Sequence, residues 1–324
     1  MLRSLKLFTA LLLALTLLAG CSFIGDFERF LGDGSSGSSD SSEEETQSSE
    51  PEEESSEPEV PEWPVTVGGV TVEGPPESVV VLSPSLYEIL RGMGFDGPVK
   101  GVGSFCGNDE LPQCGTAMDP DVDAIAALSP QYLLTSSAPP EKELELLEQA
   151  GIAVITLEPA VRLEGLEKLY TDLALFSAGL VLGEEAAESY WDGCMKLLEA
   201  ATEKAGQLAD AEDILYLRMP ELTVATADTL EGELMTRLGF TNAAGKYGGW
   251  VYPKEDVGEL SPDVIIADAD VSEGELEKSE LYSGSPAVKN GLVCRTDMSV
   301  FERQGREMFE ELLRVMNELA QNAG

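Results

Sequence analysis

The sequence contains no histidine among its 324 residues. A chain without histidine cannot form a Ser-His-Asp triad or a Cys-His pair, the usual means of activating a serine or cysteine nucleophile. It also offers no histidine ligand to zinc or to haem iron. The absence therefore argues against a hydrolase and against the most common metal centres.

Basic residues are scarce as well. The chain has 20 lysines and arginines against 60 acidic residues, and its formal net charge is -40. Nucleic acid is not expected as a partner, because binding to phosphates needs a positive surface. An anionic lipid surface would repel the body of the protein in the same way, and the acidity itself is typical of a soluble protein.

Residues 1–20 have the order of a signal peptide. Arg3 and Lys6 precede an apolar run over residues 7–18, which is too short for a membrane-spanning helix. The run ends in Leu-Ala-Gly-Cys, which resembles a bacterial lipobox whose cysteine, here Cys21, is lipidated. An ordinary signal peptide followed by a chance cysteine is the alternative. We expect an extracytoplasmic protein anchored to the outer face of the cytoplasmic membrane by lipidated Cys21.

Residues 21–62 are predicted to form an acidic, disordered tether behind this anchor. Residues 32–62 are mostly Gly, Ser, Glu, Asp and Pro, with twelve acidic residues and no basic one. Such a composition cannot bury a core, and its like charges keep it extended. The folded region is expected from Trp63 onward.

Two segments of similar sequence indicate two similar lobes. Residues 123–135 and 255–267 each contain an acid, a short helical stretch, Leu-Ser-Pro and an apolar strand. Between them, residues 162–183 carry apolar side chains at spacings of three and four, which predicts one long rigid helix that ends at Gly183. The expected parts are an N-terminal lobe over 63–161, the inter-lobe helix over 162–183 and a C-terminal lobe over 184–324.

Short apolar strands alternate with helical patterns in both lobes, after a small Gly-Gly hairpin over residues 65–72. This alternation predicts an α/β fold with two lobes, each a parallel sheet covered by helices. Ligands of such sheets bind beyond the carboxyl ends of the strands. The candidate strands are residues 79–82, 99–103, 132–135, 154–157, 214–217, 222–225, 264–267 and 292–294.

Four cysteines remain when Cys21 is set aside, an even number for an exported protein. Three pairings are possible, and we favour disulfides between Cys106 and Cys114 and between Cys194 and Cys294. The first would close a short loop, and the second would join a helix to the last strand. A metal site made from cysteines this scattered is much less favoured.

Several linked motifs make the chain similar to the class III substrate-binding proteins of ABC importers. They are Ser-Val-Val-Val-Leu-Ser-Pro-Ser-Leu-Tyr-Glu-Ile-Leu at 78–90, Val-Lys-Gly-Val-Gly at 99–103, both Leu-Ser-Pro segments and Phe-Glu-Arg at 301–303. The resemblance runs from about residue 65 to the C-terminus, and the cobalamin-binding member is the nearest match. It implies two lobes joined by a single rigid helix, with a corrinoid, a ferric siderophore or haem bound between them.

The resemblance also implies partners. Members deliver their ligand to a membrane permease and its ATPase, and they dock through one acidic residue on each lobe. The two Leu-Ser-Pro segments place Asp123 and Glu255 at those positions. The alternative is that both are ordinary first-turn acids favoured by the helix dipole. We expect a monomer without a cofactor of its own.

Similarity assigns three ligand-binding residues. Phe105 falls where the cobalamin binder has a cleft tyrosine, Trp250 near its second-lobe tryptophan, and Arg303 on the arginine of Phe-Glu-Arg. Aromatic faces suit a macrocycle or catechol rings, and arginine suits an anionic or amide edge. Two further tryptophans of that cleft fall on Ala117 and Ser136, which departs from the cobalamin pattern. Other candidates near strand ends, for which packing roles are equally plausible, are Ser85, Tyr87, Met118, Arg218 and Tyr252.

Two other classes of function compete with a transport receptor. An enzyme on the same scaffold is disfavoured because a histidine base and a nucleophile motif are missing, and Gly-Val-Gly at 101–103 is too slight for a nucleotide loop. A surface sensor or adhesion protein would keep the fold without an importer. Haem as the ligand would need Met118 or Tyr87 as its iron ligand. We therefore interpret the chain as a receptor and not as an enzyme.

Replacement of Cys21 by alanine tests the anchor. The variant should be released from the membrane or left unprocessed, because the acyl chains that hold the mature protein are attached to this sulfur. Membrane fractionation with immunoblotting measures the result. Normal processing together with continued membrane attachment would show that Cys21 is not the anchor.

Overall fold

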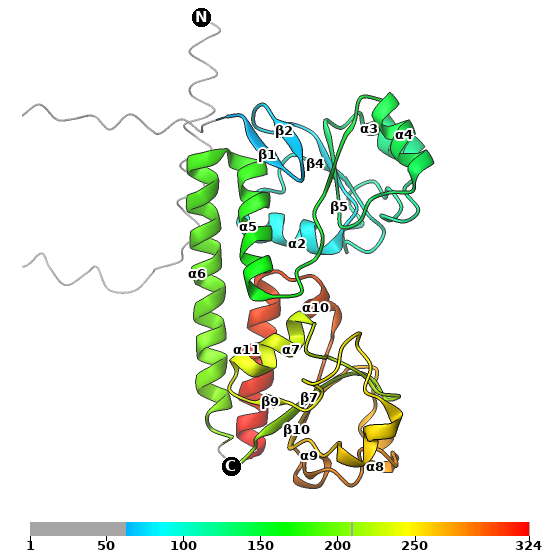
Figure 1. Ribbon diagram of the computed structural model, residues 1–324. Coiled ribbons are helices and arrows are strands. Elements are labelled where there is room, and N and C mark those ends of the chain that lie inside the picture. The colour runs from blue at the N-terminus through cyan, green and yellow to red at the C-terminus, as the bar shows by residue number, and fades with distance from the viewer. Residues whose placement is uncertain (1–62, 209, 324) are drawn as a thin grey trace, which may run out of the picture. The chain divides into compact units, whose positions relative to one another are not determined.

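The computed structural model describes residues 63–208 and 210–323 (Figure 1). The predicted signal peptide, Cys21 and the tether over residues 21–62 lie outside the described residues. Within the described part of the chain, no helix is long and apolar enough to cross a membrane.

The N-terminal lobe contains a four-stranded parallel sheet. A hairpin precedes it, in which β1 (Val65–Val67) pairs antiparallel with β2 (Val70–Val72), as the Gly-Gly pair predicts. The strand order of the sheet is β4-β3-β5-β6, with every neighbouring pair parallel. Its elements are β3 (Val79–Val81), α2 (Pro84–Met93), β4 (Val99–Val102), α3 (Val122–Leu128), β5 (Tyr132–Thr135), α4 (Glu141–Gln149) and β6 (Ala153–Thr156).

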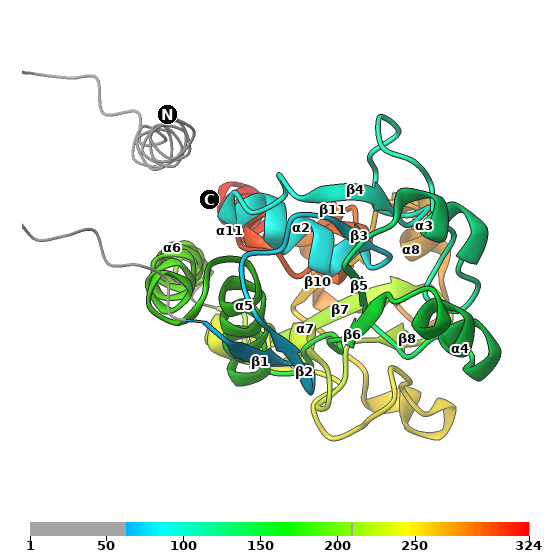
Figure 2. The same cartoon turned by 90° about the horizontal axis from the view of Figure 1, so that it is seen from above.

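Helices cover this sheet on both faces because alternate strand side chains point to opposite sides. Val80 of β3 belongs to one buried cluster with Ile125 of α3 and Leu147 just before the end of α4. Its neighbours Val79 and Val81 belong to a second cluster that includes α2 and extends toward the C-terminal lobe. Figure 2 shows α3 and α4 on the opposite side of the sheet from α2.

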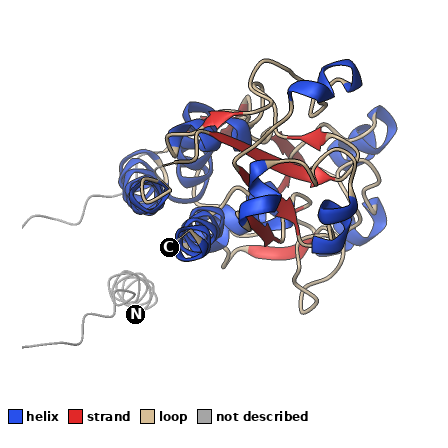
Figure 3. Ribbon diagram, turned by 90° about the horizontal axis from the view of Figure 1, so that it is seen from below, coloured by secondary structure: helices blue, strands red, loops and turns tan. Residues whose placement is uncertain are grey.

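The C-terminal lobe has a second sheet with the order β11-β10-β7-β8, and β9 also pairs with β7. Helices lie outside the strands of both lobes in Figure 3. All pairs in this sheet are parallel except β7 with β8. Its elements are β7 (Asp213–Met219), β8 (Thr223–Val224), α7 (Leu230–Arg237), β9 (Thr241–Asn242), the 3₁₀ helix η1 (Lys254–Glu259), β10 (Val264–Asp268), α8 (Glu273–Lys278), α9 (Pro286–Asn290), β11 (Val293–Thr296), α10 (Ser299–Glu302) and α11 (Arg306–Asn322).

One strand differs from the sequence prediction in its direction. Residues 222–225 were expected to form another strand of a parallel sheet, but β8 runs antiparallel to β7. The chain turns back directly after β7, and Leu222 in this turn has a positive φ of 73°. A turn of a few residues can join only antiparallel neighbours, because a parallel pair needs a long crossover.

Two helices connect the lobes where one continuous helix was predicted. α5 (Leu163–Ala178) begins next to the C-terminal lobe, and α6 (Leu180–Ala205) packs against both α5 and α11 (Figure 1). The helix over residues 162–183 is therefore broken at Gly179, whose φ is 84°. Gly183, the expected end, lies inside α6, where a Cβ would stand 2.8 Å from the carbonyl oxygen of Ala174. Its missing side chain lets α6 approach the backbone of α5.

A buried amide fastens the two lobes at the start of α5. The side chain of Gln304 accepts a hydrogen bond from the N–H of Ala160 at 2.9 Å and donates one to its carbonyl at 2.7 Å. The hydroxyl of Tyr170 donates to the carbonyl of Gln304 at 2.6 Å. Two residues later, the N–H of Arg306 donates to the hydroxyl of Tyr190 on α6 at 2.9 Å. We call residues 160 and 304–306 with their tyrosine partners the lobe junction.

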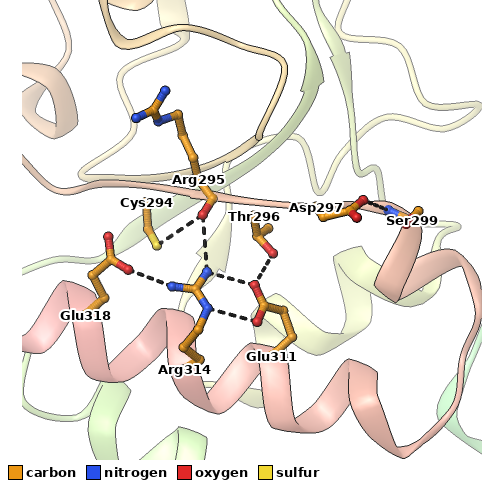
Figure 4. A network of polar contacts seen from close by, with 8 residues as sticks. All are labelled: Cys294, Arg295, Thr296, Asp297, Ser299, Glu311, Arg314 and Glu318. Atoms are coloured by element: carbon orange, nitrogen blue, oxygen red, sulfur yellow. Dashed lines mark hydrogen bonds and ion pairs between the residues drawn. The ribbon is translucent and has the colours of Figure 1, made fainter.

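The helix that follows the junction is attached to the edge strand β11 by a polar network (Figure 4). Arg314 of α11 donates to both carboxylate oxygens of Glu311, to Glu318 and to the carbonyl of Arg295. The hydroxyl of Thr296 donates to Glu311 as well. Burial raises the pKa of the Glu311 carboxyl, but these hydrogen bonds outweigh it and the net shift is downward. The network holds α11 in register with the sheet.

Substitution of Gln304 by alanine should destabilise the protein by about 2 kcal/mol or more, because both backbone groups of Ala160 lose their partner in a buried place. Urea unfolding followed by circular dichroism measures the change. The exposed Gln207→Ala serves as the matched control and should change little. Equal midpoints for the two variants would show that the amide does not hold the lobes together.

A candidate binding site at the facing ends of the two sheets

The carboxyl ends of the strands in one lobe face those of the other lobe. Ala160 follows β6, Gln304 follows β11, and these two residues are joined in the lobe junction. Nearby, the N–H of Leu163 donates to Glu233 of α7 at 2.9 Å. Parallel α/β sheets bind ligands beyond these ends. We call the facing loops the interlobe face, which comprises residues 103–118 and 136–137 of the N-terminal lobe and 218–219, 250–251 and 302–303 of the C-terminal lobe.

Large apolar side chains are exposed on the interlobe face. Phe105 and Met118 are 72% and 69% exposed, and both lie in the loop after β4. Met219, at the end of β7, and Val251 are 53% and 56% exposed. Exposed apolar groups that come together from separate loops are typical of a binding surface, whereas isolated ones are not. Each lobe therefore carries exposed apolar side chains in its loops of the interlobe face.

Trp250 and Arg218 form a stacked pair on the C-terminal side. The central guanidinium carbon of Arg218, in β7, lies 5.5 Å from the centre of the indole ring of Trp250. Arg218 also forms an ion pair with Glu302 of α10. The ring of Tyr216 meets the indole edge-on at 6.4 Å between centres. The arginine is thus held between a carboxylate and an aromatic face.

Arg303 extends from the C-terminal lobe to the N-terminal lobe. Its Nη2 lies 4.0 Å from the position that a Cβ of Gly107 would occupy. Among the residues that the structure describes, the ion pairs do not include Arg303. The nearby carboxylate of Asp297 is occupied by Ser299, whose hydrogen bonds lower the pKa of that aspartate. Arg303 therefore places a positive charge between the lobes of a strongly acidic protein.

Three predicted ligand residues are buried. Ser85 and Tyr87 of α2 are 4% and 3% exposed, and the Tyr87 hydroxyl accepts a hydrogen bond from Asn108 at 2.6 Å. Tyr252 is 2% exposed and packs on Tyr247 at 4.7 Å between ring centres. Packing explains these three side chains. Phe105, Arg218, Trp250 and Arg303 lie on the interlobe face, and so does Ser136, which follows β5 and is half-buried.

A polar cavity of about 470 Å³ lies away from this face. It is enclosed by the β1–β2 hairpin, the end of β6 and α5, and its described lining includes no aromatic side chain. Its lysine, Lys168, is paired with Asp172 at 2.5 Å. The remaining charged group of this lining is the exposed Glu158, so the cavity presents no free positive charge to an anionic ligand.

The sequence from residue 79 to residue 300, more than half of the chain, matches the family described as periplasmic binding protein. The chain belongs to this family. Its members are binding proteins rather than enzymes, in agreement with the interpretation of the sequence. No curated protein matches the chain in a sequence comparison.

Solved structures show the fold in more detail. The periplasmic haem-binding protein RhuT from Roseiflexus sp. RS-1 is 20% identical with a TM-score of 0.61, covering 78% of this chain and all of that one. The periplasmic vitamin B12 binding protein BtuF of Vibrio cholerae is 18% identical with a TM-score of 0.56, covering 77% and 98%. The iron uptake substrate-binding protein PiuA from Streptococcus pneumoniae is 19% identical with a TM-score of 0.58, covering 79% and 95%. The predicted α/β fold of two lobes is confirmed.

The cysteines of this binding protein correct the predicted disulfides. The described cysteines after Cys21 are all buried free thiols. Cys194 lies beside Arg306 and Glu310, whereas Cys294 lies beside Arg314 and Glu318. Eight residues of α11 correspond to about 12 Å, beyond the reach of a disulfide of about 7 Å between Cα atoms. The pairing of Cys194 with Cys294 is therefore wrong.

Cys106 and Cys114 share the loop between β4 and α3, but they are also free thiols, so the predicted bond is absent. The sulfur of Cys106 lies 3.7 Å from the carbonyl oxygen of Val81, and that of Cys114 lies 3.6 Å from the carbonyl of Pro112. Burial raises the pKa of each thiol to about 11. Protonated and buried, both behave as small apolar groups.

The two acids of the repeated segments lie on the surface of the binding protein. Asp123 is exposed in the first turn of α3, and Glu255 is exposed in the first turn of η1. The helix cap of α3 is made by Asp121, which accepts from the N–H of Ala124 at 2.9 Å. Asp123 is therefore not needed as the capping residue.

Several residues of the interlobe face were missed by sequence reasoning. Met219 ends β7, so its position was a usable signal, whereas Val251 lies nine residues after β9 and carries no such signal. Glu302 lies in the Phe-Glu-Arg motif, but nothing in the sequence indicates its pairing with Arg218. Asp228, which supports the loop before Trp250, is distant from every motif.

Substitution of Glu88 by glutamine should stabilise the protein at neutral pH. Burial raises the pKa of this carboxyl, Glu307 raises it further, and Arg91 and Arg303 only partly oppose the shift. Because the folded pKa is raised, the wild-type carboxyl favours folding below its ordinary value of 4.5 and loses this advantage as the pH rises. Thermal unfolding from pH 7 to pH 4 should show a gain in Tm that shrinks on acidification. A gain independent of pH, or one equal to that of the exposed Glu185→Gln, would contradict this account.

Proposed function

We propose that this protein captures a metal-bearing compound, a ferric siderophore or a corrinoid, between its lobes and delivers it to an ABC permease. The observation that carries the proposal is the interlobe face, whose loops carry exposed apolar side chains from both lobes together with Arg218 and Arg303. Such a surface suits a compound that is largely apolar and carries an anionic or amide edge. Similar structures have haem, vitamin B12 and iron uptake in their names, which supports this range of ligands.

The choice among these ligands rests on a few side chains. Cobalamin has no special support, since the B12 binder is no more similar in structure than the haem binder. Haem, the alternative, would need an iron ligand other than histidine. Tyr87 is buried and hydrogen-bonded to Asn108, so Met118 is the better placed of the two predicted iron ligands. A ferric siderophore, whose iron is held by the siderophore itself, needs no protein ligand and agrees best with these residues.

The proposed setting is the outer face of the cytoplasmic membrane. A lipid on Cys21 and the acidic tether would hold the folded part near its permease, and a non-transport sensor on the same fold is the other possibility. The expected protein is a monomer whose partners are the permease, its ATPase and the ligand.

Ligand identification tests the proposal. Protein without the signal peptide and with Cys21→Ala should be heated with cyanocobalamin, haemin, a ferric catecholate and a ferric hydroxamate. A true ligand at 100 times its dissociation constant should stabilise the fold by about 2.7 kcal/mol. Phe105→Ala should reduce that gain, whereas Leu146→Ala, an equally apolar change on the exposed surface of α4, should not. No shift with any of the four compounds would contradict the proposal.

Delivery to the permease is proposed to depend on Asp123 and Glu255. Asp123→Arg or Glu255→Arg should lower ligand uptake by about tenfold, because a reversed charge would repel a basic pocket. Ligand affinity should stay unchanged, and Glu145→Arg on exposed α4 is the matched control. Binding and uptake are measured in the same variants. Intact uptake after both reversals, or loss of binding in a folded variant, would refute a docking role.

A further inference from the structure

The loop before Trp250 wraps around one carboxylate. Both oxygens of Asp228 accept hydrogen bonds from the N–H of Gly249, at 3.0 and 3.1 Å. A Cβ on Gly248 would lie 3.1 Å from the same carboxylate, so the loop approaches as closely as glycine permits. The hydrogen bonds from Thr226 and Gly249 lower the pKa of Asp228 below its ordinary value.

The hydroxyl of Thr226 links the carboxylate of Asp228 to the backbone of Trp250. It donates to Asp228 at 2.6 Å and accepts from the N–H of Trp250 at 3.2 Å. Gly249 and Trp250 have positive φ values of 73° and 62°. A tryptophan rarely adopts this conformation unless its surroundings impose it. Asp228 and Thr226 hold the N–H groups of Gly249 and Trp250, and the N–H of Val224 donates to the carbonyl of Trp250 at 3.1 Å.

The backbone conformation of Trp250 sets the position of its indole ring. Its face lies against the guanidinium of Arg218, which Glu302 holds from another side. Trp250 is only half-exposed, so a ligand that approaches from the N-terminal lobe meets Arg218 together with the ring and not a bare aromatic face. A guanidinium backed by an aromatic ring is a receptor for an anionic or carbonyl group.

We propose that Asp228 is a positioning residue of the binding site, which fixes Trp250 beneath Arg218 so that the pair receives an anionic group of the ligand. The role of the pair in recognition rests on the proposed function. The positioning itself is a property of the protein without ligand, and it is tested without one.

Fluorine NMR of protein labelled with 5-fluorotryptophan measures the positioning. The chain has three tryptophans, and Trp250→Phe assigns the signal of interest. Asp228→Ala should shift this signal and leave the other two in place, because the loop loses its acceptor. Asp228→Asn keeps an acceptor oxygen, so the Trp250 signal should return close to its wild-type position. Asp192→Ala on exposed α6 is the matched control. An unchanged Trp250 signal in Asp228→Ala would overturn the positioning role.

Binding of the same compounds measures recognition. The probes are haemin and a ferric tris-catecholate, which are anionic, and cyanocobalamin, which is not. For an anionic probe that binds the wild type, Asp228→Ala and Arg218→Gln should each raise the dissociation constant about tenfold, and Asp228→Asn should not. Equal affinities in Asp228→Ala and Asp192→Ala would overturn the recognition role. If no probe binds the wild type, both the proposed function and the recognition role of the pair are contradicted. The positioning role of Asp228 is then judged from the fluorine signal alone.

Discussion

The arrangement of the two lobes depends on one buried amide. Gln304 pairs with both backbone groups of Ala160, and its own carbonyl accepts the hydroxyl of Tyr170. A buried polar group that loses its partner costs about 1 to 3 kcal/mol, so opening the lobes at this point would remove several partners at once. The interlobe spacing is therefore set by hydrogen bonds and not only by apolar contact, which tolerates sliding.

The same segment supplies the charged side chains of the interlobe face. Glu302 and Arg303 directly precede Gln304, so their backbone is fixed wherever the amide is fixed. A ligand that met these groups would not have to order them first, and less affinity would be lost to conformational entropy. Rigidity and recognition thus have one structural origin, in a chain whose remaining surface is mostly acidic and would repel anions.

Local patterns were enough to predict most of the fold. The Gly-Gly pair predicted the β1–β2 hairpin, and the apolar runs after the two Leu-Ser-Pro segments predicted β5 and β10, because burial on both faces of a parallel sheet leaves a continuous apolar signature. The inter-lobe helix was predicted with a wrong end. Gly179 and Gly183 could each end the helix. Only the packing of α6 on α5 decides that Gly179 breaks it while Gly183 lies inside α6.

The candidate site was less predictable, because its contacts join residues that are distant in sequence. Phe105 and Arg303 were found through motifs, but a motif gives no exposure, and Tyr87, equally close to a strand end, is buried. Asp228 carries no signal at all, since its role exists only where a glycine loop closes around it. A sequence pattern reports what a residue's own segment needs. The function of a site between two lobes depends on which charges and apolar groups remain exposed after all segments have packed. Those groups are set by contacts between distant segments, which no local pattern contains.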